Sequence, residues 1–393
     1  MSRDPDSRYS RRKFLVGTGA AGALAIAGCS SGDGGSEETE TEASGDGGSE
    51  ETETEMEETE TEMEETATEA SQSGDSGPST LEAGGSSTVY PVANTAASYW
   101  NANRPASDSE YWPFAEYNID NPEELALADY WAGLYGFEPG GESEPPFRWT
   151  VGLSHSGTGV RKVRDGIYDI GNSSGNVEDE LPDRDSYEKF VDHVVAVDGQ
   201  PLVVSSEIKE AGVTGITGQQ LKDIYKDRIN NWSELGGPDK EILTLARVKG
   251  SGTRTAFVSN TFGNPEENTI VDNRYGQNQR LAQAVAQADN AISYLALAFL
   301  DTDGVEPISL EWEGTTYKYQ DPQNGLDSKK YPLSRDLHMY TWEGTDMREA
   351  SVINMMLHPF GQETFVAPNN YFVLGERRLG EQRAKLPDQQ PWW

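Results

Sequence analysis

The stretch Lys249-Gly250-Ser251-Gly252-Thr253-Arg254-Thr255 follows an apolar run at 242–246 and leads into a second one at 256–258. This order predicts a strand, a tight loop and the first turn of a helix. The two glycines let the backbone come close to a ligand, and the serine and threonine beside them offer hydroxyls. Because a helix N-terminus carries free N–H donors and about half a positive charge, the stretch is typical of an oxyanion site.

Two arginines, Arg247 and Arg254, flank this loop. A guanidinium group can donate two parallel hydrogen bonds, which suits a tetrahedral oxyanion. The loop lacks the G-x-x-x-x-G-K-[ST] pattern of ATP-type phosphate loops, so nucleotide hydrolysis is not expected. An ordinary glycine–serine turn between a strand and a helix is the simpler interpretation. The loop alone does not distinguish this turn from an oxyanion site.

Residues 1–29 have the features of a signal for twin-arginine export. The arginine pattern at 10–15 precedes an apolar, small-residue stretch that is too short to span a bilayer of ~30 Å. The stretch ends Ile26-Ala27-Gly28-Cys29, which resembles a lipoprotein cleavage site with Cys29 as the lipidated residue. Because Cys29 is the only cysteine, no disulfide and no thiolate metal cluster is expected. A plain signal peptide with a chance cysteine is the alternative.

Residues 30–84 are predicted to form an acidic, disordered linker. They contain 19 Asp or Glu residues and no Lys or Arg, and segment 32–42 is repeated at 45–55. Such a sequence cannot bury a core, and its like charges keep it extended. We expect the linker to tether a folded domain to the membrane, and a cation-binding tail is the alternative.

The remaining residues, 86–393, are still acidic, with 46 Asp or Glu residues against 26 Lys or Arg residues. This balance argues against nucleic acid as a partner. The excess is spread along the chain, which favours the solvated surface of a halophile over a docking face for a basic partner. In molar salt the Debye length falls to ~3 Å, so an acidic protein can still bind an anion. The four histidines have no metal-ligand spacing, and no metal or cofactor is expected.

Strand patterns alternate with helix patterns from about residue 86 onward, which predicts an α/β architecture with mostly parallel sheets. Three further hydroxyl-rich turns lie at such junctions: around Ser87 and Thr88, at 154–160 and at 169–175. The first is equally consistent with a plain helix N-cap. The third formally matches the nucleophile elbow G-x-S-x-G, but no helix is expected directly after it.

Residues 108–149 are rich in aromatic side chains and irregular in pattern. We predict an inserted lobe that packs its own aromatic residues. A lid or a partner-docking role is the alternative for this segment.

Together, these segments resemble the phosphate-binding proteins of high-affinity phosphate ABC transporters, in a haloarchaeal-like, acid-rich version. The resemblance is carried, in the family's order, by segments 85–91, 156–159, 169–174, 221–225 with 231–232, 247–254, 291–294 and 331–335. It implies a two-lobed periplasmic-binding-protein fold of type II, with two mixed, mostly parallel sheets flanked by helices and joined by hinge crossovers. The implied lobes are 85–198 with 335–393, and 199–334.

The same resemblance implies a set of phosphate contacts. They are hydroxyl, glycine and arginine residues of the four turns, with the flanking Arg254 as a second guanidinium: Ser87, Thr88, Ser156, Ser174, Arg247, Ser251, Gly252, Thr253 and Arg254. The anion would lie dry between two lobes that close around it. The implied protein is not an enzyme. It is a monomer on the outer face of the cell membrane, lipid-anchored, that delivers phosphate to an ABC permease and its ATPase.

Two positions depart from the family's pattern. Many relatives carry Asp at the position of Ser174, where a carboxylate accepts the proton of hydrogen phosphate and thereby excludes sulfate. Lys249 stands where an Asp often precedes the glycine. Both changes weaken the expected selection of phosphate over sulfate, so a receptor for sulfate or another tetrahedral oxyanion remains an alternative. A secreted phosphoesterase or serine hydrolase, and an adhesive protein with purely structural turns, are further alternatives.

Overall fold

The computed structural model describes residues 80–141, 143–182 and 184–393. The predicted export signal with Cys29, and residues 30–79 of the predicted linker, lie outside this part of the chain. The linker prediction was wrong for residues 80–84, because they belong to strand β1 (Thr80–Ser86). Leu81 and Ala83 are buried in this strand, and the glycines and serines around them obscure the short alternation in the sequence.

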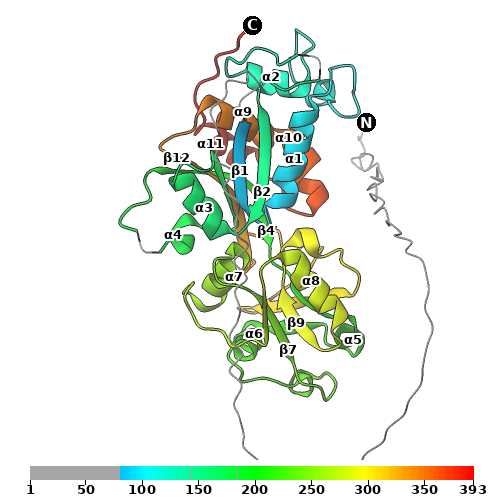
Figure 1. The fold of residues 1–393 in the computed structure, drawn as a ribbon. Coiled ribbons are helices and arrows are strands. Elements are labelled where there is room, and N and C mark those ends of the chain that lie inside the picture. Colours follow the sequence, from blue (N-terminus) through cyan, green and yellow to red (C-terminus); the bar gives the residue numbers. More distant parts are fainter. Residues whose placement is uncertain (1–79, 142, 183) are drawn as a thin grey trace, which may run out of the picture. The chain divides into compact units, whose positions relative to one another are not determined.

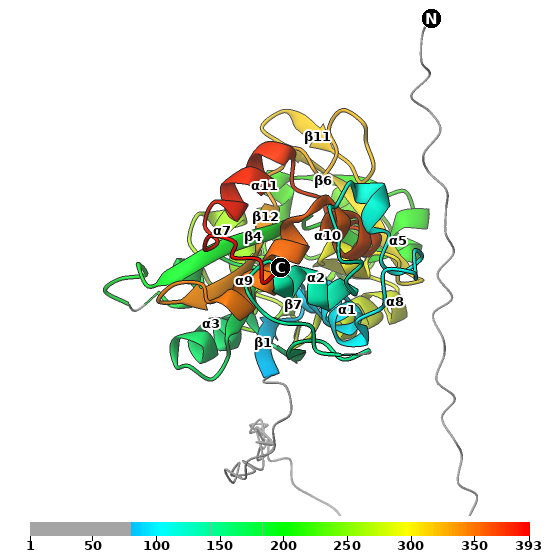
Figure 2. The same cartoon turned by 90° about the horizontal axis from the view of Figure 1, so that it is seen from above.

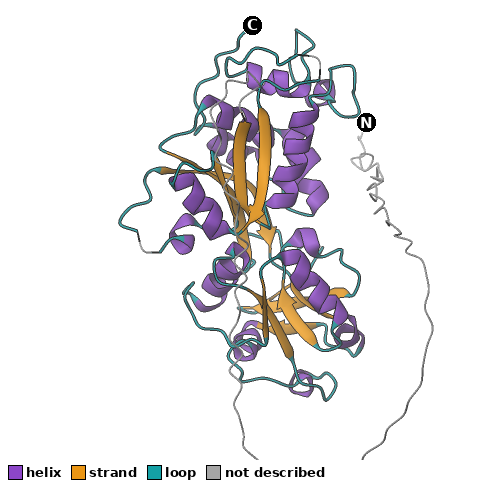
Figure 3. Cartoon of the chain, viewed as in Figure 1, coloured by secondary structure: helices purple, strands orange, loops and turns teal. Residues whose placement is uncertain are grey.

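The first sheet has the strand order β2-β1-β3-β12-β4 (Figures 1 and 3). Strands β1, β2 and β3 run parallel, whereas β12 is antiparallel to both β3 and β4. Helices α3 and α1 lie on opposite sides of β1 in both views (Figures 1 and 2). The strands are β2 (Arg148–Ser154), β3 (Ile170–Ser173), β4 (Phe190–Gly199) and β12 (Ser334–Trp342).

The second sheet has the order β11-β10-β5-β9-β7-β8, with β6 paired to β10. Here too parallel and antiparallel pairs occur together, so both sheets are mixed and less parallel than the sequence predicted. The strands are β5 (Leu202–Ser205), β6 (Gly215–Thr217), β7 (Leu243–Arg247), β8 (Asn273–Tyr275), β9 (Ala291–Tyr294), β10 (Val305–Trp312) and β11 (Thr315–Tyr317).

Helices flank both sheets (Figure 3). Thr217 is an N-cap, since its hydroxyl accepts from the backbone N–H of Gln220 in a complete capping box. The α-helices are α1 (Tyr90–Ala102), α2 (Leu127–Gly133), α3 (Ser156–Arg164), α4 (Val177–Glu180), α5 (Ser206–Glu210), α6 (Gly218–Ile224), α7 (Gly252–Phe262), α8 (Asn278–Gln287), α9 (Met347–Leu357), α10 (Pro359–Gly361) and α11 (Glu376–Arg383). Shorter helical turns span Phe114–Tyr117, Trp232–Leu235, Leu297–Phe299, Gln362–Val366 and Ala367–Asn369.

Two segments connect the sheets, and they run side by side. The chain leaves the first sheet after β4, through Gln200, and returns through 318–333 to β12. The backbone N–H of Gln200 donates to the carbonyl of Leu333 at 3.1 Å, and the hydroxyl of Tyr331 donates to the carbonyl of Gln200 at 2.7 Å. The two crossovers are therefore bonded to each other where they pass between the sheets.

The aromatic segment 108–149 is not a separate lobe. Trp112 and Trp131 are buried with their ring centroids 6.1 Å apart, as expected for aromatics that pack on each other. They also pack on the C-terminal part of the chain, because Trp112 lies edge-on to Phe360 at 5.2 Å and Trp131 lies 5.2 Å from His358. The segment thus belongs to the core that covers the first sheet.

Candidate functional site

The N-termini of four helices meet between the two sheets, and hydroxyl groups lie at their meeting point. Helices α1 and α3 come from the first sheet, and α7 and α8 from the second. The hydroxyls of Thr88, before α1, and Thr253, in α7, lie 3.0 Å apart. The side-chain amide of Asn278, the first residue of α8, donates to the hydroxyls of Thr88 at 3.0 Å and Ser87 at 3.3 Å. All four side chains are buried.

The loop 248–251 connects β7 to α7 as the sequence predicted. Gly250 has a φ of +83°, a conformation that favours glycine. Gly252 begins α7 in close contact with the first lobe: a Cβ atom there would lie 2.7 Å from the hydroxyl oxygen of Ser174 and closer still to that of Ser156. Glycine is therefore required for this helix to approach the two serines.

The predicted serines of the first lobe are brought together. The backbone N–H of Ser174 donates to the hydroxyl of Ser156 at 3.1 Å, and the two hydroxyl oxygens are 3.4 Å apart. Ser86, at the end of β1, donates its hydroxyl to that of Ser174 at 2.9 Å. The ends of β1 and β3 and the start of α3 thus form one hydroxyl-lined wall of the site.

Arg247, at the end of β7, is a buried cation with neutral partners. Its side chain is 1% exposed and donates to the carbonyls of Gly276 at 2.6 Å and Tyr275 at 3.1 Å and to the hydroxyl of Thr253 at 3.2 Å. None of the ion pairs among the described residues includes Arg247. Burial lowers the pKa of its guanidinium to about 9, because desolvation disfavours the charged form.

A second arginine, Arg335 on β12, faces the same hydroxyls. Its guanidinium donates to the hydroxyls of Thr88 and Thr253, each at 3.3 Å, and to the carbonyl of Ser174 at 3.1 Å. It also forms a buried ion pair with Asp198 on β4, in which Nε and Nη2 both donate to Oδ2, at 2.9 and 2.6 Å. Arg335 therefore brings hydrogen-bond donors to the site but little net charge.

Sequence reasoning missed Arg335, Asp198 and Asn278 as residues of the site. Arg335 lies in a segment that resembles the family, but only the antiparallel register of β12 and β4 places it opposite Asp198. Asn278 begins a helix that carries no glycine-rich signal. A polar residue at the first position of α8 was the only available indication.

Several buried polar atoms around this point have no hydrogen-bond partner among the described residues. They lie at the end of β2 and at the starts of α3, α7 and α8: the hydroxyls of Ser154 and Ser251, Nδ1 of His155, and the side-chain carbonyls of Gln277 and Asn278. Buried polar groups are nearly always satisfied in folded proteins. Their concentration here indicates a place where a polar ligand or ordered solvent completes the hydrogen bonding.

The side chains of two cationic residues named from the sequence, Arg254 and Lys249, point away from the site. The guanidinium of Arg254 lies 3.4 and 3.5 Å from the carbonyls of Pro265 and Glu267, so only its backbone N–H, in the first turn of α7, is directed as expected for an anion contact. Lys249 forms an exposed ion pair with Glu266 at 2.5 Å. The added positive charge at the loop is thereby largely neutralised.

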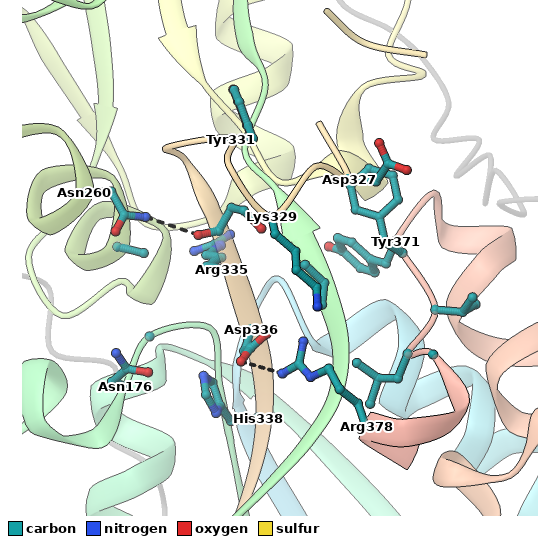
Figure 4. Close-up of a pocket in the computed structure, with 18 of the residues that line it drawn as sticks. Asn176, Asn260, Asp327, Lys329, Tyr331, Arg335, Asp336, His338, Tyr371 and Arg378 are labelled. Carbon is teal, nitrogen blue, oxygen red and sulfur yellow. Dashed lines mark hydrogen bonds and ion pairs between the residues drawn. The ribbon is translucent and has the colours of Figure 1, made fainter. Parts of the chain in front are cut away.

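A cavity of about 1080 Å³ lies next to the site and is lined by both lobes (Figure 4). Arg335 and Gly175 are in its wall, together with Asn260 of α7 and Tyr371, whereas the predicted anion contacts lie deeper and are closed off from it. The side chain of Asn260 donates to the carbonyl of Ser334, the first residue of β12. Because Thr88 of the first lobe is bonded to Thr253 and Asn278 of the second, and all three are buried, the described structure has the lobes closed over the hydroxyl groups.

Helix α4 begins two residues after Gly175, so the expectation of no helix directly after the elbow-like segment was wrong, but the serine there is engaged as a turn residue. The hydroxyl of Ser173 donates to the carbonyl of Gly175 at 2.7 Å and accepts from its N–H at 3.3 Å, so it caps a turn. Within the part of the chain that the structure describes, no group of His, Cys, Asp and Glu side chains is arranged to hold a metal ion. No helix in that same part is long and apolar enough to cross a bilayer.

Comparison with known protein families identifies the superfamily to which the chain belongs. The family described as "PBP superfamily domain" matches residues 138–353, more than half of the chain. The chain belongs to the PBP superfamily. Among curated members, the phosphate-binding protein PstS of Bacillus subtilis is 32% identical over 202 residues, which are 51% of this chain and 62% of that protein. PstS of Borreliella burgdorferi is 25% identical over 198 residues, 49% of this chain and 67% of that one.

Solved structures show the same fold for this PBP superfamily member. A putative phosphate ABC transporter substrate-binding protein from Clostridium perfringens, with bound phosphate, superposes with a TM-score of 0.55 at 23% identity, over 75% of this chain and all of that one. A DING protein superposes with a TM-score of 0.51 at 10% identity, over 77% and 93%. The expected two-lobed fold with mixed sheets is confirmed. The match to the Bacillus protein spans less than two thirds of its length.

Proposed function

We propose that this chain is an extracellular solute-binding protein that captures inorganic phosphate between its lobes and delivers it to an ABC permease. Arg247 carries the proposal: it is a buried guanidinium whose hydrogen bonds all go to neutral acceptors. A buried charge normally has a partner of opposite sign, because desolvating it alone is costly. An anion bound beside Arg247 supplies that partner.

The surrounding donors favour a tetrahedral oxyanion over a carboxylate. The N-termini of α1, α3, α7 and α8 present backbone N–H groups from both lobes, and the hydroxyls of Thr88 and Thr253 lie between them. Such donors approach from several directions and match four oxygens better than two. The names of the Bacillus and Borreliella relatives and the phosphate in the Clostridium structure support phosphate as the anion.

Sulfate is the second candidate, and the surroundings of Ser174 favour it. This hydroxyl accepts from Ser86 and lies near Ser156, so the wall presents alcohols where relatives have a carboxylate. An alcohol can donate to an oxygen of sulfate and does not require a proton on the ligand, whereas an ionised carboxylate does. Selection between the two anions then depends on groups farther from the ligand.

Calorimetric titration of the full chain in molar KCl tests both candidates. Phosphate should bind one-to-one, and sulfate added to the phosphate complex should displace it only at much higher concentration. Tighter binding of sulfate would move the assignment to the second candidate. The absence of heat with either anion would refute an oxyanion receptor of any kind.

We further propose that lobes 85–198 with 335–393, and 199–334, close by bending at the two crossovers around Gln200 and Leu333. In this proposal the protein acts as a monomer without a cofactor and hands its ligand to the permease and ATPase. The hydrogen bonds between Asn278 and the threonine and serine before α1 hold the lobes together. Opening must break these contacts together with the hydrogen bonds that Thr253 makes with Thr88 and Arg335.

Export and anchoring are proposed from residues 1–29 by their pattern alone. If Cys29 is lipidated, the wild-type protein should partition into the membrane fraction of cells that express it. The variant Cys29→Ser should appear in the soluble extracellular fraction, and a Ser30→Ala control should stay with the membrane. Equal partitioning of Cys29→Ser and wild type would contradict the lipid anchor.

A further inference from the structure

Glu180, the last residue of α4, is a buried carboxyl group that the proposed function does not use. It is 7% exposed, and neither of its carboxyl oxygens has a hydrogen-bond partner among the described residues. Buried carboxylates are normally paired or hydrogen-bonded, since an isolated buried negative charge is strongly disfavoured. The state of this side chain therefore needs an explanation.

The carboxyl group of Glu180 lies directly behind the serine wall of the site. A Cβ atom on Gly175, the residue after Ser174, would be 2.6 Å from Oε1. A Cβ atom on Gly157, the residue after Ser156, would be 3.3 Å from Oε2. The carboxyl group thus packs against the glycines that follow Ser174 and Ser156, whose hydroxyls line the proposed anion site.

The cations near Glu180 do not neutralise it. Arg335 is engaged by Asp198, and Arg161 is exposed to solvent. Burial raises the pKa of Glu180 to about 8, because desolvation outweighs the opposing effects of the nearby Thr255 hydroxyl and of the two arginines. The groups around it are the carboxylate of Asp179 on α4, Arg161 on α3, Arg335 and Tyr340 on β12, and the hydroxyl of Thr255 on α7.

We propose that Glu180 holds a proton whenever an oxyanion occupies the site, so that anion capture is linked to protonation of this residue. The inference rests on the proposed function. A bound dianion carries two negative charges, and the single uncompensated positive charge of Arg247 neutralises only one of them. An ionised Glu180 behind the serines would add a further buried negative charge. Where the empty protein has lost this proton, binding takes one from solvent and yields a neutral carboxylic acid and a bound anion. Glu180 is in this view a positioning residue that sets the charge of the site.

The proton uptake can be measured on the wild-type protein. Phosphate is titrated calorimetrically into the full chain at about pH 7, 8 and 9, in pairs of buffers with different heats of ionisation, and sulfate is used in parallel because it does not titrate in this range. Binding should take up close to one proton at about pH 9, and affinity should fall toward tenfold per pH unit above about pH 8. No proton uptake at the highest pH would overturn the inference without any variant.

Two variants separate Glu180 from the other titrating groups. Glu180→Gln imitates the protonated side chain, so it should bind the anion with an affinity that varies much less with pH and with less proton uptake than wild type. Glu178→Gln, on the same helix but exposed, should behave as wild type. Any uptake that Arg247 contributes persists in both variants, so the difference between wild type and Glu180→Gln isolates the glutamate.

The outcomes are distinguishable from failure of the proposed function. If no anion gives heat at any pH, the receptor proposal fails. If wild type binds but Glu180→Gln has the same proton uptake, or if a folded Glu180→Gln no longer binds, the inference fails and the receptor proposal stands. Should Glu180→Gln not fold, infrared difference spectra of wild type at about pH 9 decide, since a protonated carboxyl band must appear on binding.

Discussion

Arg247 and Arg335 donate to the same hydroxyl of Thr253, yet their surroundings differ in charge. Arg335 has Asp198 as its counterion, whereas Arg247 has backbone carbonyls and a hydroxyl. One arginine therefore organises the site, and the other leaves a positive charge for a ligand to neutralise. Residue type alone does not distinguish the two roles.

We predict that Arg247→Ala weakens phosphate binding by roughly 10²- to 10⁴-fold, since about two charge-assisted hydrogen bonds of ~1.5–3 kcal/mol each are lost. The matched variant is Arg254→Ala, which removes a guanidinium directed at carbonyls 265 and 267. It should stay within a few-fold of wild type. Calorimetric titration measures both affinities, and an equal loss in the two variants would show that the site has been assigned to the wrong arginine.

At the scale of the element, α7 matters most, because its first turn makes several of the contacts between the lobes. It begins with a glycine packed on Ser156 and Ser174, and its second residue, Thr253, carries the hydroxyl shared by both arginines. A helix start is rigid and rich in donors, so small changes there alter the closed state more than the fold of either lobe.

Gly252→Ala should therefore abolish or strongly weaken phosphate binding while each lobe stays folded. The added methyl group would overlap the hydroxyls of Ser156 and Ser174 and hold the lobes apart. Gly380→Ala, in α11 with open space around it, is the matched control and should bind normally. Titration gives the affinity and circular dichroism the folding, and normal binding by Gly252→Ala would mean that the closed contact is dispensable.

For the molecule as a whole, protonation of buried groups couples folding to pH. Burial raises the pKa of Glu349 to about 8, as it does for Glu180. Burial lowers the pKa of His193 and of His358 to about 4. The carboxyls bind more protons in the folded state than in the unfolded chain, and the histidines bind fewer. Where their titration ranges overlap, the two classes therefore change the free energy of unfolding with pH in opposite directions.

Between about pH 7.5 and 8 the carboxyls are expected to dominate, because unfolded histidines, with a pKa of about 6.5, have by then lost most of their protons. The folded state still holds protons that unfolded Glu residues have released, so the free energy of unfolding should fall as pH rises through this window. Glu349→Gln should reduce the slope and raise the melting temperature at pH 8 by a few degrees. Thermal melts across the window test this, with the exposed Glu311→Gln as control. An unchanged slope would contradict a protonated Glu349.

The acid excess of residues 86–393 is also a property of the whole molecule. If it is the surface of a halophile, KCl should raise the melting temperature steadily from dilute to molar concentration, since screening relieves repulsion between carboxylates. Sodium sulfate is unsuitable for this test because sulfate is a candidate ligand. A melting temperature that is independent of KCl would favour the alternative, a docking face for a basic partner.

What the sequence determined by itself is local. The loop after β7, the N-cap at Thr217 and the hydroxyl-rich turns follow from residues that are neighbours in the chain, because glycine conformation, capping and helix N-termini depend on a few consecutive residues. These signals were enough to place Arg247 and the serines and threonines near one another. They failed at 80–84, where the buried side of β1 depends on two other strands.

Only the tertiary structure decided the electrostatics. The pairing of Arg335 with Asp198 requires β12 to return antiparallel to β4, and the approach of Asn278 to Thr88 joins residues 190 positions apart. The burial of Glu180 likewise depends on the turns packed over α4. Charge and solvation at the site are set by contacts between distant segments, and such contacts exist only once the sheets and helices have packed, because no local pattern encodes which side chains lose their water.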